Sequence, residues 1–437
     1  MDVARLKASF ARIAMHGDEV PLHFYSDLFL KHPETRTMFP VSMQAQRAHL
    51  VDALVRVVAS ADNAESLTPF LQDLGRDHRK FGTLAGHYEA VGDSLLATFA
   101  YFSGEAWDAE LEADWKAAYE LIASVMTAAA SKDEQERPAF WKGTVVATER
   151  RTFDIAVLTV RTNPALDYVP GQSVAVESPA RPRLWRYYSM ANAPRGDGTV
   201  DFHVRLIDGG AVSMALTAHT AVGTELRIGP PVGALRLRAS AGRDMLMVAG
   251  STGLAPLKAM IEQLAAGAWV PSSQAAGGLA PGGLAPGGRP VRGQVAVGQV
   301  PRGQPQHGQA SHGQPRPAQL TGGQLPSVHL FFGTRTVDGL YDLPNLEKLA
   351  AEHPWLTVVP VVSDGRFGGQ AGLLSGGRFG GQTGLLPDVV VRYGNWSGHD
   401  AYLAGPTDMV QDASVRLTAA GMPANQIHVE DFGWSET

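Results

Sequence analysis

Cysteine is absent from the 437 residues of this sequence. Disulfide bonds, zinc–thiolate sites and iron–sulfur clusters are therefore excluded, because each of them is built from cysteine sulfur. A redox metal in this protein must instead be held by histidine, tyrosine, methionine or carboxylate side chains.

Three other absences narrow the class of protein. A basic excess is missing, since 37 Lys and Arg face 43 Asp and Glu and the formal net charge is -6, which argues against a nucleic-acid binder. No apolar run approaches the ~20 residues of a membrane-spanning helix. The N-terminal segment lacks the apolar core and cleavage site of a signal peptide. We expect a monomeric cytoplasmic protein without stable membrane insertion, acting on small molecules.

The chain is too long for one ordinary core, and three sequence patterns divide it. Residues 1–136 carry apolar residues at three- and four-residue spacing between Gly and Pro breakers, which predicts an all-α domain. Residues 137–243 contain short β-branched and aromatic runs, typical of a small antiparallel β-barrel. Residues 244–437 alternate strand and helix patterns, which predicts an α/β domain with a parallel sheet.

Two segments interrupt the last region. Residues 268–326 are rich in Gly, Pro and Gln and contain no Asp, Glu or Lys, so we expect a disordered insertion. "GRFGGQAGLL" at 365–374 is nearly repeated as "GRFGGQTGLL" at 377–386, which indicates a duplicated loop within 365–386. Both are expected to be tolerated surface insertions.

Two motifs in the predicted barrel carry chemistry. "RYYS" at 186–189 places a cation, an aromatic ring and a hydroxyl on one strand and its turn. Arg186 can neutralise a pyrophosphate, and Tyr188 and Ser189 suit an isoalloxazine ring and its hydrogen bonds. "GGAVS" at 209–213 offers close backbone approach and N–H groups at a helix start, which suits a phosphate. Either motif alone also has a purely structural interpretation.

Two turns follow predicted strands of the α/β region. "VAGSTGLAP" at 248–256 continues a buried-strand run and opens into a helix, with glycines for a tight turn and a proline for the first helical turn. "YLAGP" at 402–406 ends a later strand. Both turns are expected at the carboxyl edge of the sheet, where ligands bind in such folds.

With these motifs, residues 138–437 resemble the ferredoxin–NADP reductase family, in which a flavin-binding barrel precedes a nicotinamide-binding α/β domain. The resemblance implies two cofactor sites. The FAD site would comprise Arg186, Tyr187, Tyr188, Ser189, Gly210, Ala211, Val212 and Ser213. The NAD(P)H site would comprise Gly250, Ser251, Thr252, Gly253, Leu254, Ala255, Pro256, Gly405 and Pro406.

Three other positions of the reductase region bear on its chemistry. Ala404 stands where the family usually has a cysteine near the nicotinamide, so hydride transfer is expected to be slower or differently tuned. Phe432 resembles the aromatic that covers the flavin, and Trp434 is a second candidate. Arg335 would either meet a 2′-phosphate or lie in a solvated loop.

The helical region ahead of the reductase contains "HFYSDLF", "TMFP", "QRAHL" and "GRDHRKFG". With these segments the whole chain resembles the flavohaemoglobins, a globin joined to a flavin reductase. The resemblance implies haem b bound through His78, because haem iron takes a neutral imidazole as its fifth ligand. It assigns the remaining haem-pocket roles to Tyr25, Phe39, Gln46, Leu50 and Tyr88.

Each of these residues has a distinct expected role. Phe39 would wedge the haem, Leu50 would limit the pocket, and Tyr88 would lie near His78. A Tyr25 hydroxyl and a Gln46 amide can donate hydrogen bonds to bound O2. The alternatives are a surface position for His78, a core position for Tyr25 and a solvent-facing Gln46.

The predicted proximal side departs from the family. Many flavohaemoglobins have a Glu on the last globin helix that supports the proximal histidine, and Ala130 falls at about that position here. Glu134 and Glu136 would need a shift of register, and Asp77 replaces a common Lys. A carboxylate near the imidazole favours oxygen activation, so its loss affects the expected reaction more than haem binding.

The expected function is that of a nitric oxide dioxygenase. Electrons would pass from NAD(P)H through FAD to haem, and O2 with nitric oxide would give nitrate. One alternative is a haem–flavin oxidoreductase with another donor or acceptor, such as a hydroxy acid donor. A second is a sensor of O2 or redox state with the 268–326 insertion as a partner-binding arm. A third is a reductase whose helical domain binds no haem.

Overall fold

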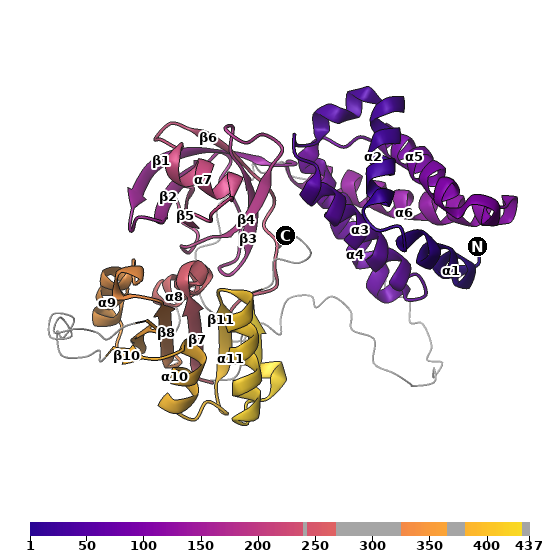
Figure 1. Ribbon diagram of the computed structural model, residues 1–437. Coiled ribbons are helices and arrows are strands. Elements are labelled where there is room, and N and C mark those ends of the chain that lie inside the picture. Colours follow the sequence, from indigo (N-terminus) through magenta and orange to yellow (C-terminus); the bar gives the residue numbers. More distant parts are fainter. Residues whose placement is uncertain (239–242, 268–324, 365–380, 431–437) are drawn as a thin grey trace, which may run out of the picture.

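The computed structural model describes residues 1–238, 243–267, 325–364 and 381–430. These residues form a helical domain, an antiparallel barrel and an α/β domain in chain order (Figure 1). All but the last two residues of the predicted insertion at 268–326, most of the duplicated loop at 365–386, and Phe432 and Trp434 lie outside the described residues. No helix among the described residues is long and apolar enough to span a membrane.

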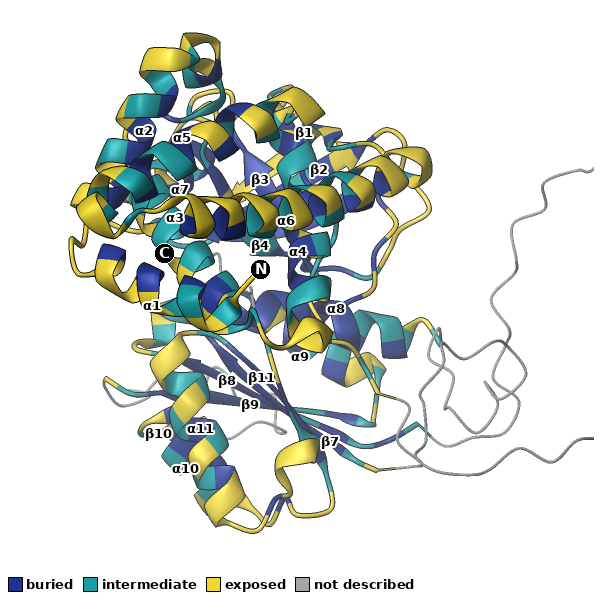
Figure 2. Ribbon diagram, turned by 90° about the vertical axis from the view of Figure 1, so that its right-hand side faces the viewer, coloured by how far each residue is buried: buried dark blue, intermediate teal, exposed yellow. Residues whose placement is uncertain are grey.

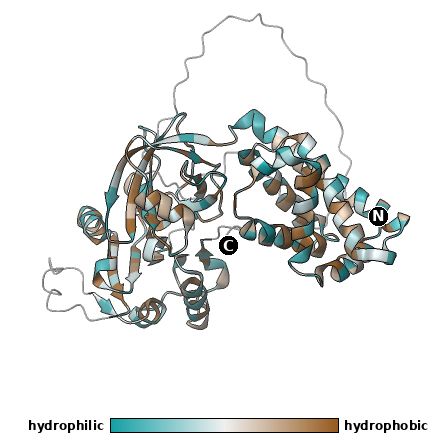
Figure 3. Ribbon diagram, turned by 45° about the horizontal axis from the view of Figure 1, so that its top comes forward, coloured by the Kyte–Doolittle hydropathy of each residue, from teal (hydrophilic) through white to brown (hydrophobic). Residues whose placement is uncertain are grey.

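The helical domain occupies the first 136 residues. Its elements are α1 Val3–Ala14, α2 Glu19–Lys31, η1 Pro33–Met38, α3 Gln44–Ala59, α4 Ala64–His78, η2 Arg79–Phe81, α5 Ala85–Ser103, η3 Gly104–Ala106 and α6 Ala109–Glu136. Asn63 caps α4 and Asp108 caps α6, each through its side-chain oxygen. α4 and α6 pack closely because Gly75 lacks a side chain, and a Cβ there would lie 2.3 Å from the Met126 carbonyl oxygen. Hydrophobic residues gather between the helices (Figure 3).

The second domain is a six-stranded antiparallel sheet in the order β4-β3-β6-β1-β2-β5. Its elements are β1 Trp141–Arg150, β2 Ile155–Thr162, β3 Ser173–Glu177, β4 Trp185–Ser189, β5 Thr199–Arg205, α7 Ala211–Ala218 and β6 Glu225–Ile228. A bridge between Met190, just after β4, and Phe202 in β5 joins the two edge strands. The sheet is thereby closed into a barrel around an apolar core.

The third domain is a parallel sheet in the order β10-β9-β8-β7-β11-β12. Its elements are β7 Met245–Gly250, η4 Ser251–Gly253, α8 Leu254–Ala265, β8 Val328–Thr334, η5 Val337–Gly339, α9 Leu343–Glu352, β9 Leu356–Val362, β10 Gln382–Thr383, α10 Leu386–Tyr393, β11 Asp400–Ala404, α11 Thr407–Ala419, η7 Ala424–Gln426 and β12 Ile427–Val429. Helices α8 and α9 cover one face, and α10 and α11 cover the other, so the central strands are buried (Figure 2). The strand order reverses between β7 and β11, which is where ligands bind in such sheets.

The predicted fold class is confirmed by these three architectures. The predicted domain limits stay predictions, although they fall between elements: α6 ends at Glu136 and β1 begins at Trp141, while β6 ends at Ile228 and β7 begins at Met245.

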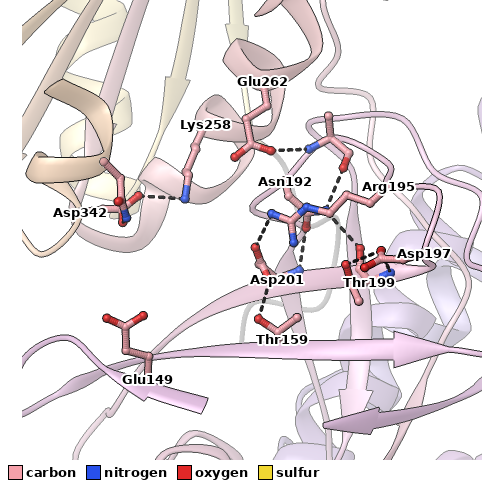
Figure 4. Close-up of polar contacts among 12 residues, drawn as sticks. Glu149, Thr159, Asn192, Arg195, Asp197, Thr199, Asp201, Lys258, Glu262 and Asp342 are labelled. Carbon is pink, nitrogen blue, oxygen red and sulfur yellow. Dashed lines mark hydrogen bonds and ion pairs between the residues drawn. The ribbon is translucent and has the colours of Figure 1, made fainter. Parts of the chain in front are cut away.

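Helix α8 of the third domain faces the barrel (Figure 4). Its Glu262 accepts a hydrogen bond from the Ala193 backbone N–H at 3.1 Å, and its Lys258 lies 3.0 Å from the buried Asp342 carboxylate. In β5, the His203 ring nitrogen Nδ1 lies 2.8 Å from the Tyr341 hydroxyl. The Lys258–Asp342 pair lies within the α/β domain, and Arg151 of the barrel approaches the same Asp342 carboxylate at 3.7 Å. The contacts of Arg151, Glu262 and His203 hold the barrel against the parallel sheet.

Candidate functional site

His78, the predicted haem ligand, is the last residue of α4. Its Nδ1 lies 2.7 Å from the Leu74 carbonyl oxygen, one turn earlier. Because a carbonyl only accepts, Nδ1 carries the proton and Nε2 keeps a free electron pair. Burial lowers the pKa of His78, against a smaller opposing effect of Asp77. The ring is therefore a neutral imidazole at neutral pH, which is the form that haem iron takes as a ligand.

Tyr25, Phe39 and Gln46 come together on the other side of the helical domain's core. The buried Tyr25 hydroxyl donates to the backbone carbonyl of Gln46 at 3.4 Å, and burial raises the pKa of Tyr25, so it remains a donor. The Phe39 ring lies 5.4 Å from the Tyr25 ring. Arg36 holds the Phe39 segment by donating to the Phe39 and Pro40 carbonyl oxygens at 3.2 and 3.0 Å. The role of the Gln46 side-chain amide stays a prediction.

The exposure of the apolar residues of helix α3 shows whether the helical domain has room for a haem. An amphipathic helix in a globular core normally buries its apolar stripe, yet Val58 is the only residue of α3 that is buried. Leu50, Leu54 and Val57 pack against the core but remain partly accessible. This partly accessible apolar surface and a neutral histidine with a free Nε2 in the same domain fit haem.

The carboxylates at the end of α6 bear on the predicted departure of the proximal side, which stays a prediction. Glu134 and Glu136 are exposed, so a register shift does not bring them to His78. The buried carboxylate of this turn is Asp133, which Arg79 and Arg137 engage. The Tyr88 ring lies 6.4 Å from the His78 ring, and its hydroxyl has no hydrogen-bond partner in the described part of the chain.

The four residues of "RYYS" form most of β4 and divide between its two faces. Tyr188 packs against the barrel core, and burial raises the pKa of its hydroxyl. Arg186 is exposed and donates to the Trp185 carbonyl oxygen. Tyr187, which the sequence assigns to FAD, points its hydroxyl at Asp77 of the helical domain at 3.2 Å. Its predicted contact with FAD is untested.

Gly210 caps the short helix α7 and forms a narrow turn. A Cβ at Gly210 would lie 2.5 Å from the Ser213 hydroxyl oxygen and 2.9 Å from the Ile207 carbonyl oxygen. The Ser213 hydroxyl closes this turn by donating to Gly210 and accepting from the Ile207 N–H. The backbone at Ala211 and Val212 begins the helix, and such an N-terminus fits an FAD phosphate.

Glu430 is a residue that sequence reasoning missed. It follows β12, and its carboxylate accepts a hydrogen bond from the Ser189 hydroxyl at the end of β4. The two residues are 241 positions apart. The available signal was the position of Glu430 directly after the last strand run and two residues before Phe432.

The two predicted nicotinamide turns lie against each other. β7 pairs with β11, with Ala249 opposite Ala404. A Cβ at Gly253 would lie 2.4 Å from the Ala404 carbonyl oxygen, and one at Gly405 would lie 2.9 Å from the Gly250 carbonyl oxygen. Only glycine permits this approach. Ser251 has a positive φ of 53°, and the turn opens into α8 through Leu254, Ala255 and Pro256.

The remaining predicted positions are located as follows. Pro406 is the N-cap of α11. Thr252 lies in η4 between Ser251 and Gly253. Arg335 follows β8 and is exposed, which is compatible with either a phosphate contact or a solvated loop.

Comparisons with known proteins match both halves of this description. A globin model matches residues 22–126, and a model of the oxidoreductase FAD-binding domain matches residues 142–237. A flavohemoprotein of Rhizobium meliloti (strain 1021) is 30% identical over 280 residues, which cover 59% of this chain and 69% of that protein. The ferredoxin–NAD(P)(+) reductase component of the naphthalene 1,2-dioxygenase system of Pseudomonas putida is 29% identical over 67% of this chain and 68% of its own length.

A solved structure extends the likeness of fold over all three domains. The flavohemoglobin from Malassezia yamatoensis, determined with bound FAD and heme, aligns with 99% of this chain and 98% of its own at a TM-score of 0.65 and 16% identity. The domain order and architecture are therefore the same. The sequence match to flavohemoproteins and the matching domain models confirm the predicted resemblance, and this chain belongs to the flavohemoprotein family.

Proposed function

We propose that this globin–reductase fusion is an NAD(P)H-dependent nitric oxide dioxygenase, which uses O2 to oxidise nitric oxide to nitrate. Its cofactors are haem b, FAD and NAD(P)H. When bound, FAD converts a hydride into single electrons and haem supplies the O2-binding site. His78 would hold the haem, β4 and the Gly210 turn would hold FAD, and the Gly250–Pro256 turn would hold the nicotinamide nucleotide.

The side chains of this chain supply orientation, donors and exclusion of water. The Leu74 carbonyl keeps the proton of His78 on Nδ1 and so orients Nε2. Tyr25 keeps its proton and supplies an O–H donor on the distal side. Phe39 and Leu50 make that side apolar, which strengthens such a hydrogen bond.

One observation supports the electron route best. The flavin strand β4 lies against the end of α4, where Tyr187 donates to Asp77, the residue before His78. The two proposed redox sites are thus held by segments in direct contact. The globin thus meets the strand proposed to hold FAD at the His78 end of α4.

A nitric oxide electrode tests this function. The wild-type protein with NAD(P)H and O2 should consume nitric oxide, and omission of O2 should abolish this consumption. His78→Ala should lose it while keeping NAD(P)H-dependent reduction of ferricyanide by the flavin. An absorption spectrum establishes first that haem and FAD are both bound. A fully loaded wild-type protein that reduces its haem but consumes no nitric oxide contradicts the proposal.

A second candidate function is a haem–flavin oxidoreductase with a different donor or acceptor. It is favoured by the proximal side, where Ala130 replaces the expected Glu and Asp133 is engaged by Arg79 and Arg137. A histidine without a carboxylate partner is a weaker electron donor to iron. Screening organic hydroxy acids for anaerobic flavin reduction separates the two, since the proposed dioxygenase takes its electrons from NAD(P)H and not from a hydroxy acid.

A further inference from the structure

Lys80 is a buried cation at the junction between the globin and the barrel. Its side chain is 3% exposed, and its ammonium lies 2.6 Å from the Asp77 carboxylate on the same helical end. It also donates to the Tyr187 hydroxyl in β4 at 3.4 Å. A buried ammonium is costly unless its charge is compensated, so the partners of Lys80 matter for the junction.

Three aromatic rings complete the surroundings of Lys80. Its Nζ lies 5.1 Å from the Phe81 ring centroid, 5.6 Å from that of Trp185 and 5.2 Å from that of Tyr187. These distances are within the range of a cation–π interaction, which strengthens when the cation is desolvated. Phe81 and Trp185 also meet edge to face across the junction at 6.3 Å. Two of the three rings belong to the barrel, so one ammonium holds both domains.

The position of this cluster along the chain connects the two proposed redox sites. Asp77 precedes His78, and Tyr187 lies between Arg186 and Tyr188 in the strand proposed to hold FAD. Tyr187 also donates to Asp77 at 3.2 Å, which closes a triangle of contacts with Lys80. Any movement of β4 away from α4 must break this triangle and leave its charges to be rehydrated.

We propose that Lys80 is a positioning residue for electron transfer from flavin to haem. It gathers Asp77 and Tyr187 and thereby fixes β4 against the His78 end of α4. Electron transfer slows steeply as donor and acceptor separate, so the population of this docked arrangement sets the transfer rate. This inference rests on the proposed electron route of the protein, and it assigns to Lys80 no contact with either cofactor.

Lys80→Met tests the proposal, because it keeps the length of the side chain and removes the charge. Lys116→Met, at an exposed position of α6, is the matched control. Anaerobic stopped-flow mixing with NAD(P)H follows flavin bleaching and haem reduction separately. We expect unchanged flavin reduction and about tenfold slower haem reduction in Lys80→Met, as for a tenfold fall in the docked population. Lys80→Arg should restore most of the rate, since it keeps the cation–π and carboxylate contacts.

Hydrogen exchange gives a readout independent of turnover. Backbone amides of 185–189 and 79–81 should exchange faster in full-length Lys80→Met than in the wild type, and Lys116→Met should leave them unchanged. A structural defect confined to the globin would accelerate 79–81 but spare the β4 amides. Tyr187→Leu removes the barrel's hydroxyl from the contact with Lys80 and Asp77. If Lys80→Met does not bind haem, the rate of haem reduction in Tyr187→Leu tests the proposal instead.

The outcomes separate this inference from the proposed function. Wild-type rates of haem reduction in both Lys80→Met and Tyr187→Leu would overturn the inference and leave the function intact. A loaded wild-type protein whose flavin is reduced but whose haem is not would overturn the electron route, and the inference with it.

Discussion

The two domain junctions of this protein are built differently. Between the barrel and the α/β domain, polar contacts are spread over Arg151 with Asp342, His203 with Tyr341, and the Ala193 backbone with Glu262. Between the globin and the barrel, the polar contacts centre on Lys80, which gathers Asp77 and Tyr187. We expect the first junction to keep its geometry when one contact is removed, because several contacts hold it. The docked arrangement of the second junction should change when Lys80 alone is replaced.

The difference matches what would pass across each junction under the proposed function. A hydride moves only between groups in direct contact, so nicotinamide and flavin sites need domains fixed by several contacts. A single electron can be transferred between groups that are not in contact, so the globin needs only a sufficient population of the docked arrangement. Four changes, in order of decreasing effect, test this contrast.

The largest effect is expected for Lys258→Met. Asp342 is the fully buried carboxylate of the α/β domain that Arg151 of the barrel approaches at 3.7 Å. The change removes the ammonium of the same domain that lies 3.0 Å from this carboxylate, leaving Arg151 and the Asn345 amide at 2.7 Å. Breaking a buried pair in this way costs about 3–5 kcal/mol of unfolding free energy. Urea unfolding followed by circular dichroism measures it. Lys348→Met, at an exposed position of α9, is the control, and an equal loss in both variants would contradict a role for the buried pair.

His203 should make the same junction sensitive to acid. Burial lowers the pKa of His203 from 6.5 to about 4. As the pH falls below 6.5, His203 becomes protonated in the unfolded chain but stays neutral in the folded protein. The contribution of His203 to the free energy of unfolding is therefore fully present above pH 6.5 and declines until about pH 4. We expect a loss of roughly 2 kcal/mol by pH 5 from this residue.

His203→Gln isolates that contribution from those of other buried histidines. Its amide can still meet Tyr341 but does not titrate. The stability difference between pH 7.5 and pH 5 should therefore shrink, while the exposed His219→Gln should leave it unchanged. Equal pH dependence in His203→Gln and the wild type would show that this buried ring does not control the junction.

Much of the fold could be predicted from sequence because each domain has its own periodicity. The candidate turns could also be predicted from sequence, since the glycines at 253 and 405 indicate close backbone approach whatever the surrounding fold. The buried carboxylate at the end of α6, Asp133, was harder to predict from sequence. A difference of one helical turn separates Ala130 from Asp133, and only packing shows that Asp133 is engaged by Arg79 and Arg137.

Contacts between distant segments account for what the sequence could not reveal. Strand alternation separates Tyr187 from Arg186 and Tyr188, but it does not say that the outer face of β4 meets the globin. Glu430 reaches Ser189 because β12 lies beside β11 at the edge of the sheet. Neither contact has a local pattern, since each depends on how whole domains dock.

A smaller effect is expected for Lys80→Met on stability. The carboxylate that it leaves behind, Asp77, is 20% exposed and can be rehydrated, unlike that of Asp342. We expect a loss of about 1–2 kcal/mol, between the values for exposed and buried pairs. Urea unfolding of the cofactor-free protein, followed by tryptophan fluorescence, compares it directly with Lys258→Met. A loss as large as that of Lys258→Met would mean that the two junctions do not differ in kind.

The smallest effect on stability is expected for Arg205→Met. Arg205 is at the end of β5, where its 43% exposed side chain donates to Asp154 at 3.0 Å and crosses to the Ser251 hydroxyl at 3.2 Å. Exposed pairs of this kind contribute about 0–1 kcal/mol. Ser251 nevertheless has a positive φ in the turn proposed to hold the nicotinamide nucleotide, and Arg205 restrains that turn from the barrel. We therefore expect the KM for NAD(P)H to rise about two- to threefold with kcat unchanged. Arg161→Met, at an exposed position of β2, should change neither value, and a fall in kcat alone would place Arg205 in hydride transfer rather than in holding the turn.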